Sequence, residues 1–279
     1  MLKDDRLEIS TQQEGPKRRF METKGLRLVF YNYFVPVFMM IGLLVLWQIF
    51  CGIFKIPVWL LPSPARIYTS TMKWANFLPM HTWVTFYETI AGFLLALLIG
   101  LPLAILIVYS SILRNTIYPI LLVFQSVPKV AIAPLFLIWI GYGAMSKTLI
   151  AAIVAFFPIV VNTATGMESV EPELLELTYS LHATKPQIFF KVRFPWALPY
   201  IFSGMKVAIT LAVIGAVIGE FVGSDKGLGY LILAASGEMN TALIFGVMAI
   251  LAMLGILTFT AVDLLEKWLC PWYIESGIK

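Results

Sequence analysis

Charged residues are scarce in this sequence, and their scarcity argues against a water-soluble protein. Only 13% of the 279 residues are charged and 59% are hydrophobic, whereas a soluble domain carries about 25% charged residues. A chain with so little polar surface would not stay dissolved, so we expect it to reside in a membrane. No basic stripe or aromatic platform accompanies the formal charge of +4, and this argues against a nucleic-acid partner.

Cysteine and histidine are also rare, with two residues of each. Cys51 and Cys270 have no metal-type spacing, and the topology below places them at opposite faces of the membrane, so we expect no disulfide. His81 and His182 are both predicted to lie outside the spans. Without an H-E-x-x-H motif, they do not indicate an intramembrane enzyme. The sequence also lacks the G-x-x-x-x-G-K-[ST] loop that cradles nucleotide phosphates.

Long hydrophobic runs are abundant, and six of them approach the 20 or so apolar residues that a membrane-spanning helix needs. They predict an all-α, polytopic membrane protein with both termini on the same side. The six runs are Phe34 to Phe54, Val84 to Val108, Ile117 to Ile140, Thr148 to Thr165, Tyr200 to Val222 and Ala242 to Leu265.

The distribution of lysine and arginine predicts the orientation of these spans. Of the 20 basic residues, 13 fall on the side of the two termini, five fall on the opposite side, and Lys129 and Lys206 lie within spans. Because loops rich in Lys and Arg stay inside the cell, both termini are expected in the cytoplasm. The expected location is the plasma membrane, which is the inner membrane of a bacterium. Segment 1–33 is predicted to be cytoplasmic, with an interfacial helix as one option.

The third span contains three prolines, and polar residues stand beside the middle one, Pro128. Proline removes a backbone donor, and broken helices in membranes occur where protein or a water-filled cavity satisfies the freed carbonyls. Gln125, Ser126 and Lys129 are therefore candidates for lining a translocation pathway. The alternative is a kinked packing helix with a lysine that reaches toward the membrane surface.

Other charged residues lie in or near the ends of spans, namely Glu88, Lys206, Glu220 and Asp263. Such groups are costly in lipid and usually face the bundle interior in pairs. Lys206 and Glu220 are predicted too far apart to pair with each other, and Lys129 with Glu220 is one candidate pair. Lys206 and Glu220 are equally candidates for the pathway, because a structural ion pair and a substrate contact both remain open.

Between the fifth and sixth spans, glycines bracket the short apolar piece Tyr230 to Ala235. This piece is far too short to cross a membrane. We expect a re-entrant or surface helix on the outer face.

A polar stretch between the fourth and fifth spans is predicted to form a short amphipathic helix. Pro172 suits the first turn, and Glu173 and Glu176 suit the positive end of the helix dipole. Apolar or small residues then recur at three- and four-residue spacing at Leu174, Leu177, Thr178 and Leu181. "HATKP" should end this helix, and "PQIFFKV" should begin a second one before Pro195 and Pro199. A helix of two turns is unstable alone, so it needs a partner.

This stretch resembles the cytoplasmic EAA loop of ABC-type import permeases, E-A-A-x3-G-x9-I-x-L-P. The glutamate, the proline and the spacing match, and the other motif positions differ. In order, the motif positions fall on Glu176, Leu177, Thr178, His182, Val192, Phe194 and Pro195. If the glycine of the family ends the helix with positive φ, His182 would occupy that conformation at a cost of roughly 1–2 kcal/mol.

Two further stretches are similar to the sulfonate, taurine and nitrate branch of the same family, which also includes permeases for thiamine precursors and riboflavin. They are "SVPKVAIAPLFLIWIGYG" and "GEFVGSDKGLGYLI". The resemblance implies a type I ABC importer permease fold over 82–267, after a first transmembrane helix at 34–54 and before a cytoplasmic tail at 268–279. It also implies a coupling loop at 168–198.

The resemblance implies partners as well. They are cytoplasmic ABC ATPase subunits that bind ATP and Mg²⁺, an extracytoplasmic solute-binding protein, and a second permease copy, expected to be identical. The chain itself would then carry no catalytic residues, no metal and no cofactor. The residues implied in ATPase coupling are Glu173, Glu176, Leu177, Thr178, Leu181, His182, Ala183 and Pro195. An ion-coupled secondary transporter is the alternative function, and it would predict inverted repeats and mid-membrane carboxylates.

Overall fold

This computed structural model describes residues 34–272, and that part of the chain is built from helices without a strand. The predicted N-terminal segment 1–33 and most of the predicted tail, 273–279, lie outside the described residues. In chain order the elements are α2 (Val35–Ile53), α3 (Pro64–Lys73), α4 (Leu78–Tyr109), α5 (Ser111–Gln125), α6 (Lys129–Ile140), α7 (Ala144–Glu168), α8 (Pro172–Ser180), α9 (Lys185–Ile188), the π-helical turn η2 (Phe189–Arg193), α10 (Phe194–Gly223), α11 (Leu228–Gly237) and α12 (Thr241–Leu269).

Five helical segments in the described residues are long and apolar enough to cross a membrane, and a bent pair brings the number to six. The five unbroken segments are α2, α4, α7, the continuous run Lys185–Gly223 and α12. The bent pair, α5 and α6, corresponds to the predicted third span. The six-span, all-α prediction is therefore confirmed in its number and type of elements.

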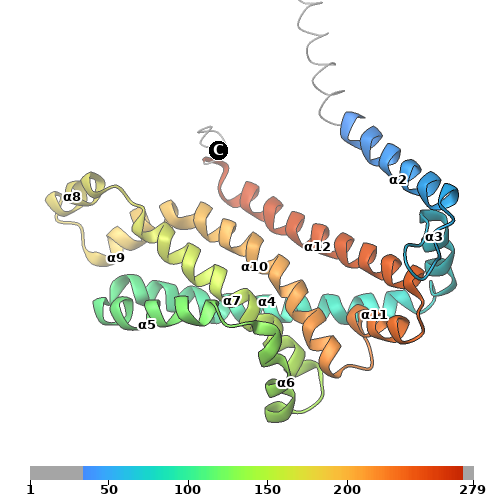
Figure 1. Cartoon of the computed structure of the whole chain (residues 1–279). Helices are drawn as coiled ribbons and strands as arrows, with labels where there is room; N and C mark the ends of the chain where they lie inside the picture. Colours follow the sequence, from blue (N-terminus) through green and yellow to red (C-terminus); the bar gives the residue numbers. More distant parts are fainter. Residues whose placement is uncertain (1–33, 273–279) are drawn as a thin grey trace, which may run out of the picture.

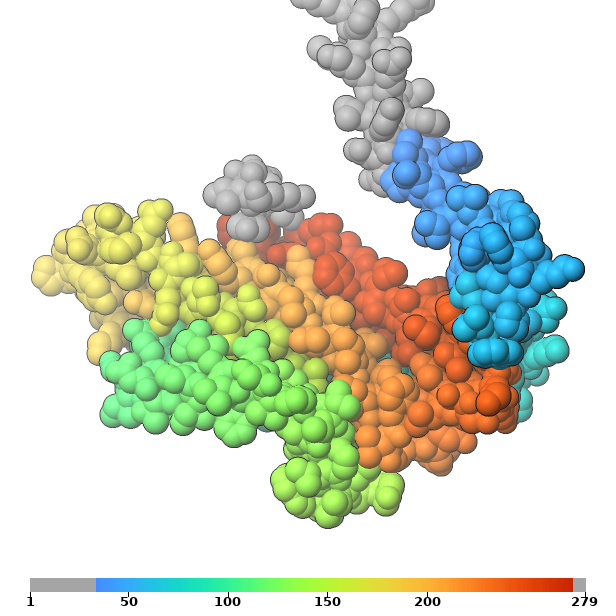
Figure 2. All heavy atoms as spheres, in the orientation of Figure 1, coloured from blue at the N-terminus to red at the C-terminus, as the bar shows by residue number. Residues whose placement is uncertain are grey.

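The prolines of the third span predicted a broken or kinked helix, and the structure has a break there: α5 and α6 meet at an angle of 100°. The break falls at Ser126, Val127 and Pro128. Pro128 has no N–H group to donate to the helix, and Val127 is disfavoured in helical geometry because it precedes a proline. In Figure 2, α6 projects from the body of the molecule beside α5. The bend therefore leaves α6 with much of its apolar surface exposed in a single chain.

Helix α7 forms the centre of the bundle, packed chiefly against α4 and α10. Small residues allow this close approach, as is usual between membrane helices. A Cβ atom on Gly92 of α4 would lie 2.5 Å from the Cβ of Ala151, and one on Gly215 of α10 would lie 2.6 Å from the Cα of the same alanine. The two neighbouring helices thus contact α7 at the same small residue from different sides.

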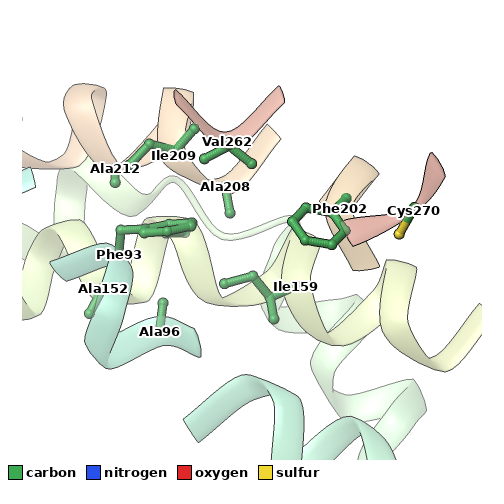
Figure 3. Packing of buried hydrophobic residues seen from close by; sticks show 11 residues of the cluster. Phe93, Ala96, Ala152, Ile159, Phe202, Ala208, Ile209, Ala212, Val262 and Cys270 are labelled. Carbon is green, nitrogen blue, oxygen red and sulfur yellow. The ribbon is translucent and has the colours of Figure 1, made fainter. Parts of the chain in front are cut away.

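The largest apolar cluster joins four helices and is shown in Figure 3. Phe93 of α4 and Ile159 of α7 face Phe202 and Ile209 of α10, and Val262 of α12 lies beside them. Cys270, which is completely buried, completes this cluster at the end of α12. Both Cys51 and Cys270 are free thiols.

The two ends of the bundle carry different short helices (Figure 1). Helices α8 and α9 lie at one end, called here the α8 end, and α3 and α11 lie at the other, called the α11 end. Helix α11 is the short apolar helix predicted around Tyr230 to Ala235. Helix α3 was not predicted, because its ten residues are amphipathic and too short to appear as a span.

The predicted second helix of the polar stretch is not separate from the fifth span. Helices α9, η2 and α10 follow one another without a gap from Lys185 to Gly223. The N–H of Phe194 bonds to the carbonyl of Phe189, one residue further back than in an α-helix. Pro195 follows this wider turn directly, so it falls where the hydrogen-bond pattern is already irregular and does not end the helix.

Candidate functional site

Helix α8 begins and ends where the sequence predicts. Pro172 occupies its first turn together with Glu173. At its other end, the N–H of Ala183 bonds to the carbonyl of Thr178 at 3.1 Å, and the N–H of His182 bonds to that of Tyr179 at 2.9 Å. This is a Schellman motif, which requires a left-handed residue after the helix. His182 takes that conformation with φ of 56°, in agreement with the predicted positive φ.

None of the nine residues of α8 is buried. Leu177 is 56% exposed and Leu181, which caps the helix, is 71% exposed. Tyr179 is also exposed, and Figure 2 shows this helix at the tip of the molecule. A two-turn helix with apolar residues on its surface gains little stability from its own hydrogen bonds. Its exposed leucines therefore form a surface suited to a partner.

The segment that carries α8 is connected to the bundle on both sides. Before α8, Glu168 pairs with Arg114 of α5 at 2.7 Å, and Met167 is fully buried. After α8, Thr184 and Gln187 form a capping box that starts α9. The Arg193 guanidinium donates to the carbonyl of Met167 at 3.3 Å, which ties the two sides together. A force applied to α8 would thus reach α7 and α10.

The predicted coupling residues are brought together only in part. Those from Glu173 to Ala183 lie on α8 or in its C-terminal cap. Pro195 lies in the first turn of α10, so it is not part of the α8 surface. Arg114, Glu168 and Arg193 anchor the segment and were not predicted. Their charges at span ends could have signalled such a role, but their partners could not be read from the sequence.

The polar residues of the third span meet at the break between α5 and α6. Lys129 donates from Nζ to the carbonyl of Gln125 at 3.0 Å and lies 5.3 Å from the centre of the Phe157 ring of α7. Gln125 and Ser126 are exposed. Lys129 has no carboxylate partner within the described residues, so the candidate Lys129–Glu220 pair does not form.

Glu220 instead belongs to a buried network at the α11 end. Its carboxylate accepts from the hydroxyl of Thr85 at 2.7 Å and from the N–H of Gly229 at 2.5 Å. The hydroxyl of Thr85 also accepts from the N–H of Leu228 at 2.8 Å. His81 accepts from the N–H of Gly227 through Nδ1 at 3.0 Å. The network therefore holds the first turn of α11 against α4 and α10.

His81 was predicted to lie outside the spans, and the structure corrects this prediction. His81 lies inside α4, which begins at Leu78 rather than at the predicted Val84. Lys147 lies inside α7 and is 5% exposed. Its ammonium pairs with the carboxylate of Glu88 at 2.6 Å. The sequence missed this pair because hydropathy locates a span without showing which residues face each other.

Lys206 lies in a third, separate ion-pair cluster between α10 and α12. Its ammonium is 3.1 Å from Asp263 and also pairs with Glu266. Asp263 in turn pairs with Lys267 at 2.7 Å. The five predicted pathway residues thus fall in three places, and only Gln125, Ser126 and Lys129 lie together. Within residues 34–272, no group of three or more His, Cys, Asp and Glu side chains is arranged to hold a metal ion.

Comparison with known proteins gives a consistent family assignment. Residues 92–275 match the family described as binding-protein-dependent transport system inner membrane component. The chain is 35% identical to the formylaminopyrimidine transport permease protein ThiX of Halalkalibacterium halodurans, over 87% of this chain and 97% of that protein. It is 38% identical to the riboflavin transport system permease protein RibX of Chloroflexus aurantiacus, over 85% and 89% of the two chains. It is 27% identical to the taurine transport system permease protein TauC of Escherichia coli, over 84% and 87%.

A solved structure shows the same fold. It is an inward-facing conformation of the MetNI methionine ABC transporter, and its matching chain superposes with a TM-score of 0.59 at 23% identity. The match covers 67% of this chain and 93% of the other. This confirms the predicted type I ABC importer permease fold.

Proposed function

We propose a mechanism from one premise: this chain belongs to the family of binding-protein-dependent transport system inner membrane components. It is the membrane-embedded permease of an ATP-binding-cassette (ABC) import system. Such systems work with ATPase subunits and a solute-binding protein. We assign this permease a small polar solute as cargo, delivered by an extracytoplasmic binding protein.

The observation that carries the mechanism is the exposed helix α8. It has a defined start and a defined end, none of its residues is fully buried in this chain, and the segments on both sides are tied to α7 and α10. We infer that α8 docks in a groove on a cytoplasmic ATPase subunit. Glu173, Glu176, Leu177, Thr178, Leu181, His182 and Ala183 would form the docked surface. Pro195 lies in the first turn of α10, so it would support the segment 168–198 without contacting the ATPase through α8.

Docking through α8 also implies how the permease is oriented in the membrane and which subunit binds ATP. The α8 end would face the cytoplasm, with both termini on that side, in agreement with the excess of basic residues there. The 279-residue sequence has no phosphate-binding loop of the Walker A type, so ATP and Mg²⁺ are assigned to the ATPase. A second, identical copy of the permease would complete the channel within the lipid bilayer. The boundaries 34–54, 82–267 and 268–279 remain our proposed division of the chain.

The break between α5 and α6 is our candidate for the solute pathway. Gln125 and Ser126 are exposed there, and the charge of Lys129 has no carboxylate partner within the described residues. Polar groups at a broken membrane helix are typical of transport pathways. Lys206 and Glu220, by contrast, already have partners within the bundle. We therefore assign the solute contacts first to the α5–α6 break and assign Lys206 and Glu220 to holding helices together.

Replacing Glu176 with arginine tests the coupling role. In proteoliposomes that contain the permease, the ATPase and the binding protein, uptake should fall roughly tenfold or more, equivalent to about 1.4 kcal/mol. ATP hydrolysis should continue without matching uptake. Glu238→Arg is the control, because Glu238 is an exposed glutamate at the opposite end of the bundle. Normal uptake by Glu176→Arg would rule out docking through α8.

Replacing Lys129 with alanine tests the pathway. The variant should assemble normally but transport more slowly, because its change removes the ammonium at the helix break. Lys226→Ala changes an exposed lysine at the α11 end and serves as the control. Identical transport kinetics for Lys129→Ala and the unmodified chain would assign Lys129 to packing alone.

A further inference from the structure

A small recess opens at the α8 end, between the helix proposed to dock and the end of α4. Its volume is about 160 Å³. Tyr179 contributes one wall from α8, and Tyr109 contributes another from the last residue of α4. Lys185 and Arg193 supply two positive charges from the segment after α8. Val108 and Ile188 complete the lining. We call this cavity the Arg193 recess.

The guanidinium of Arg193 is already positioned at the edge of this recess. Its Nη1 donates to the carbonyl of Met167 at 3.3 Å, and its Cζ lies 6.0 Å from the centre of the Tyr109 ring. An arginine has five N–H donors in a planar fork. Because one carbonyl and one ring fix its orientation, the remaining donors can bind an anion with little further loss of side-chain entropy.

No carboxylate in the described residues balances these two charges. Neither Lys185 nor Arg193 takes part in an ion pair between residues 34 and 272. Glu168, which follows Met167 in α7, pairs with Arg114 instead. The recess therefore combines two cations, two phenol rings and space for a small anionic group.

We propose that the Arg193 recess receives a carboxylate side chain of the ATPase subunit that covers α8. The proposal rests on the proposed function, since it needs an ATPase at this end. The recess is continuous with the proposed docking surface, because Tyr179 of α8 lines it. A partner that covers Leu177 and Leu181 would therefore reach the rim of the recess. The proposal also follows from charge, because a carboxylate can accept two N–H bonds from one guanidinium. The contact would fix the register of α8 on the ATPase.

A zero-length cross-link tests this contact directly. Carbodiimide joins a lysine amine to a carboxylate only when the two touch, so Lys185 should form an amide with an Asp or Glu of the ATPase in the assembled transporter. Mass spectrometry would identify the joined peptides. Lys185→Arg keeps the positive charge but cannot form this amide. The cross-link should therefore disappear in Lys185→Arg while the complex still assembles, and absence of the cross-link in the unmodified complex would contradict the proposal.

Binding measurements provide a second readout. Arg193→Gln should weaken binding of the ATPase to the permease in nanodiscs about tenfold, which corresponds to about 1.4 kcal/mol. The difference from the unmodified chain should shrink as salt is raised, because salt screens the contact. Lys191→Gln is the matched control: Lys191 is exposed in the same π-helical turn and does not line the recess. The affinity of the Lys191→Gln permease for the ATPase should change less than twofold.

Lipid composition separates this proposal from a site for an anionic lipid. The binding measurement is repeated in nanodiscs of phosphatidylcholine alone and in nanodiscs that contain phosphatidylglycerol. An equal effect of Arg193→Gln in both supports the ATPase carboxylate. An effect seen only with phosphatidylglycerol assigns the recess to a lipid phosphate and overturns the proposal. If Arg193→Gln binds normally while Glu176→Arg does not couple, the recess proposal fails and docking through α8 stands.

Discussion

At the α11 end of the bundle, Glu88 and Glu220 are each 1% exposed, and both have partners from other helices. At the α8 end, Glu173 and Glu176 are exposed and have no ion-pair partner within the described residues. Both pairs of glutamates belong to a chain in which only 13% of the residues are charged. The same residue type therefore meets two different environments in one molecule.

This difference indicates which end is complete in a single chain. A buried charge costs several kcal/mol unless a partner within the protein satisfies it, so the α11 end has to be assembled when the chain folds. The exposed glutamates and leucines of α8 pay no such cost before a partner arrives. The α11 end thus resembles the inside of a folded protein, and the α8 end resembles one half of an interface.

The largest loss of stability is expected from Lys147→Met at the α11 end. This change leaves the carboxylate of Glu88 buried without its ion-pair partner, so it should lower the free energy of unfolding by about 3–5 kcal/mol. The measurement is the thermal unfolding midpoint and the yield of monodisperse protein in detergent. Lys226→Met, at an exposed lysine of the same end, should behave like the unmodified chain.

A double variant sharpens this test. Glu88→Gln combined with Lys147→Met removes both charges together, so it should recover much of the lost stability. An unchanged midpoint for Lys147→Met alone would show that the Glu88–Lys147 pair is not required at this end.

A smaller loss of stability is expected from Thr85→Val. The hydroxyl of Thr85 donates to Glu220 and accepts from the N–H of Leu228, so its removal leaves buried polar groups without partners. The expected loss is about 2 kcal/mol, with faster hydrogen exchange at the amides of Leu228 and Gly229. Thr82→Val is the matched control, because that hydroxyl bonds only within its own helix, to Leu78. Equal exchange in the two variants would show that Thr85 does not hold α11.

At the α8 end, His182→Gly should stabilise the end of the helix by about 1 kcal/mol, because glycine adopts positive φ without a Cβ penalty. The amides of His182 and Ala183, which close the Schellman motif, should exchange more slowly with solvent. His182→Val should have the opposite effect, since a β-branched residue is poorly suited to this conformation. Slower exchange in the valine variant would contradict this account of the cap.

The smallest effect on stability is expected from Leu181→Ser. Leu181 is 71% exposed, so its replacement should change the free energy of unfolding by no more than about 0.5 kcal/mol. Uptake should nevertheless fall, because the proposed docking surface loses an apolar side chain. Leu231→Ser is the counterpart at the α11 end, where the side chain is 2% exposed; it should destabilise the chain clearly. Equal stability losses in the two variants would remove the contrast between the ends.

Several local features could be predicted because neighbouring residues decide them. Pro128 predicted the interruption of the third span, and Pro172 predicted the first turn of α8. Positive φ at His182 followed from the spacing of a family motif. The 100° turn at the interruption was not predicted, since a proline shows where a helix breaks and the packing of α6 against α7 and α10 sets where the chain goes next.

The candidate sites also differ in how far the sequence predicted them, depending on whether their residues are neighbours in the chain. The α8 surface lies within one short stretch, so the sequence named most of its residues. The Arg193 recess was not anticipated, because its lining comes from α4, α8 and the segment before α10. Thr85 and Glu220 are separated by 135 positions in the chain, and no periodicity connects them.

The sequence by itself determined that this chain enters a membrane, which segments are long and apolar enough to cross it, and where α8 starts and stops. These properties depend on the transfer of apolar residues into lipid and on backbone geometry, both of which act over a few neighbouring residues. The tertiary structure alone decided which charges are neutralised inside the chain and which stay exposed on its surface. Pairing requires side chains from distant helices to come within hydrogen-bond distance, and only the packing of those helices against one another brings them there.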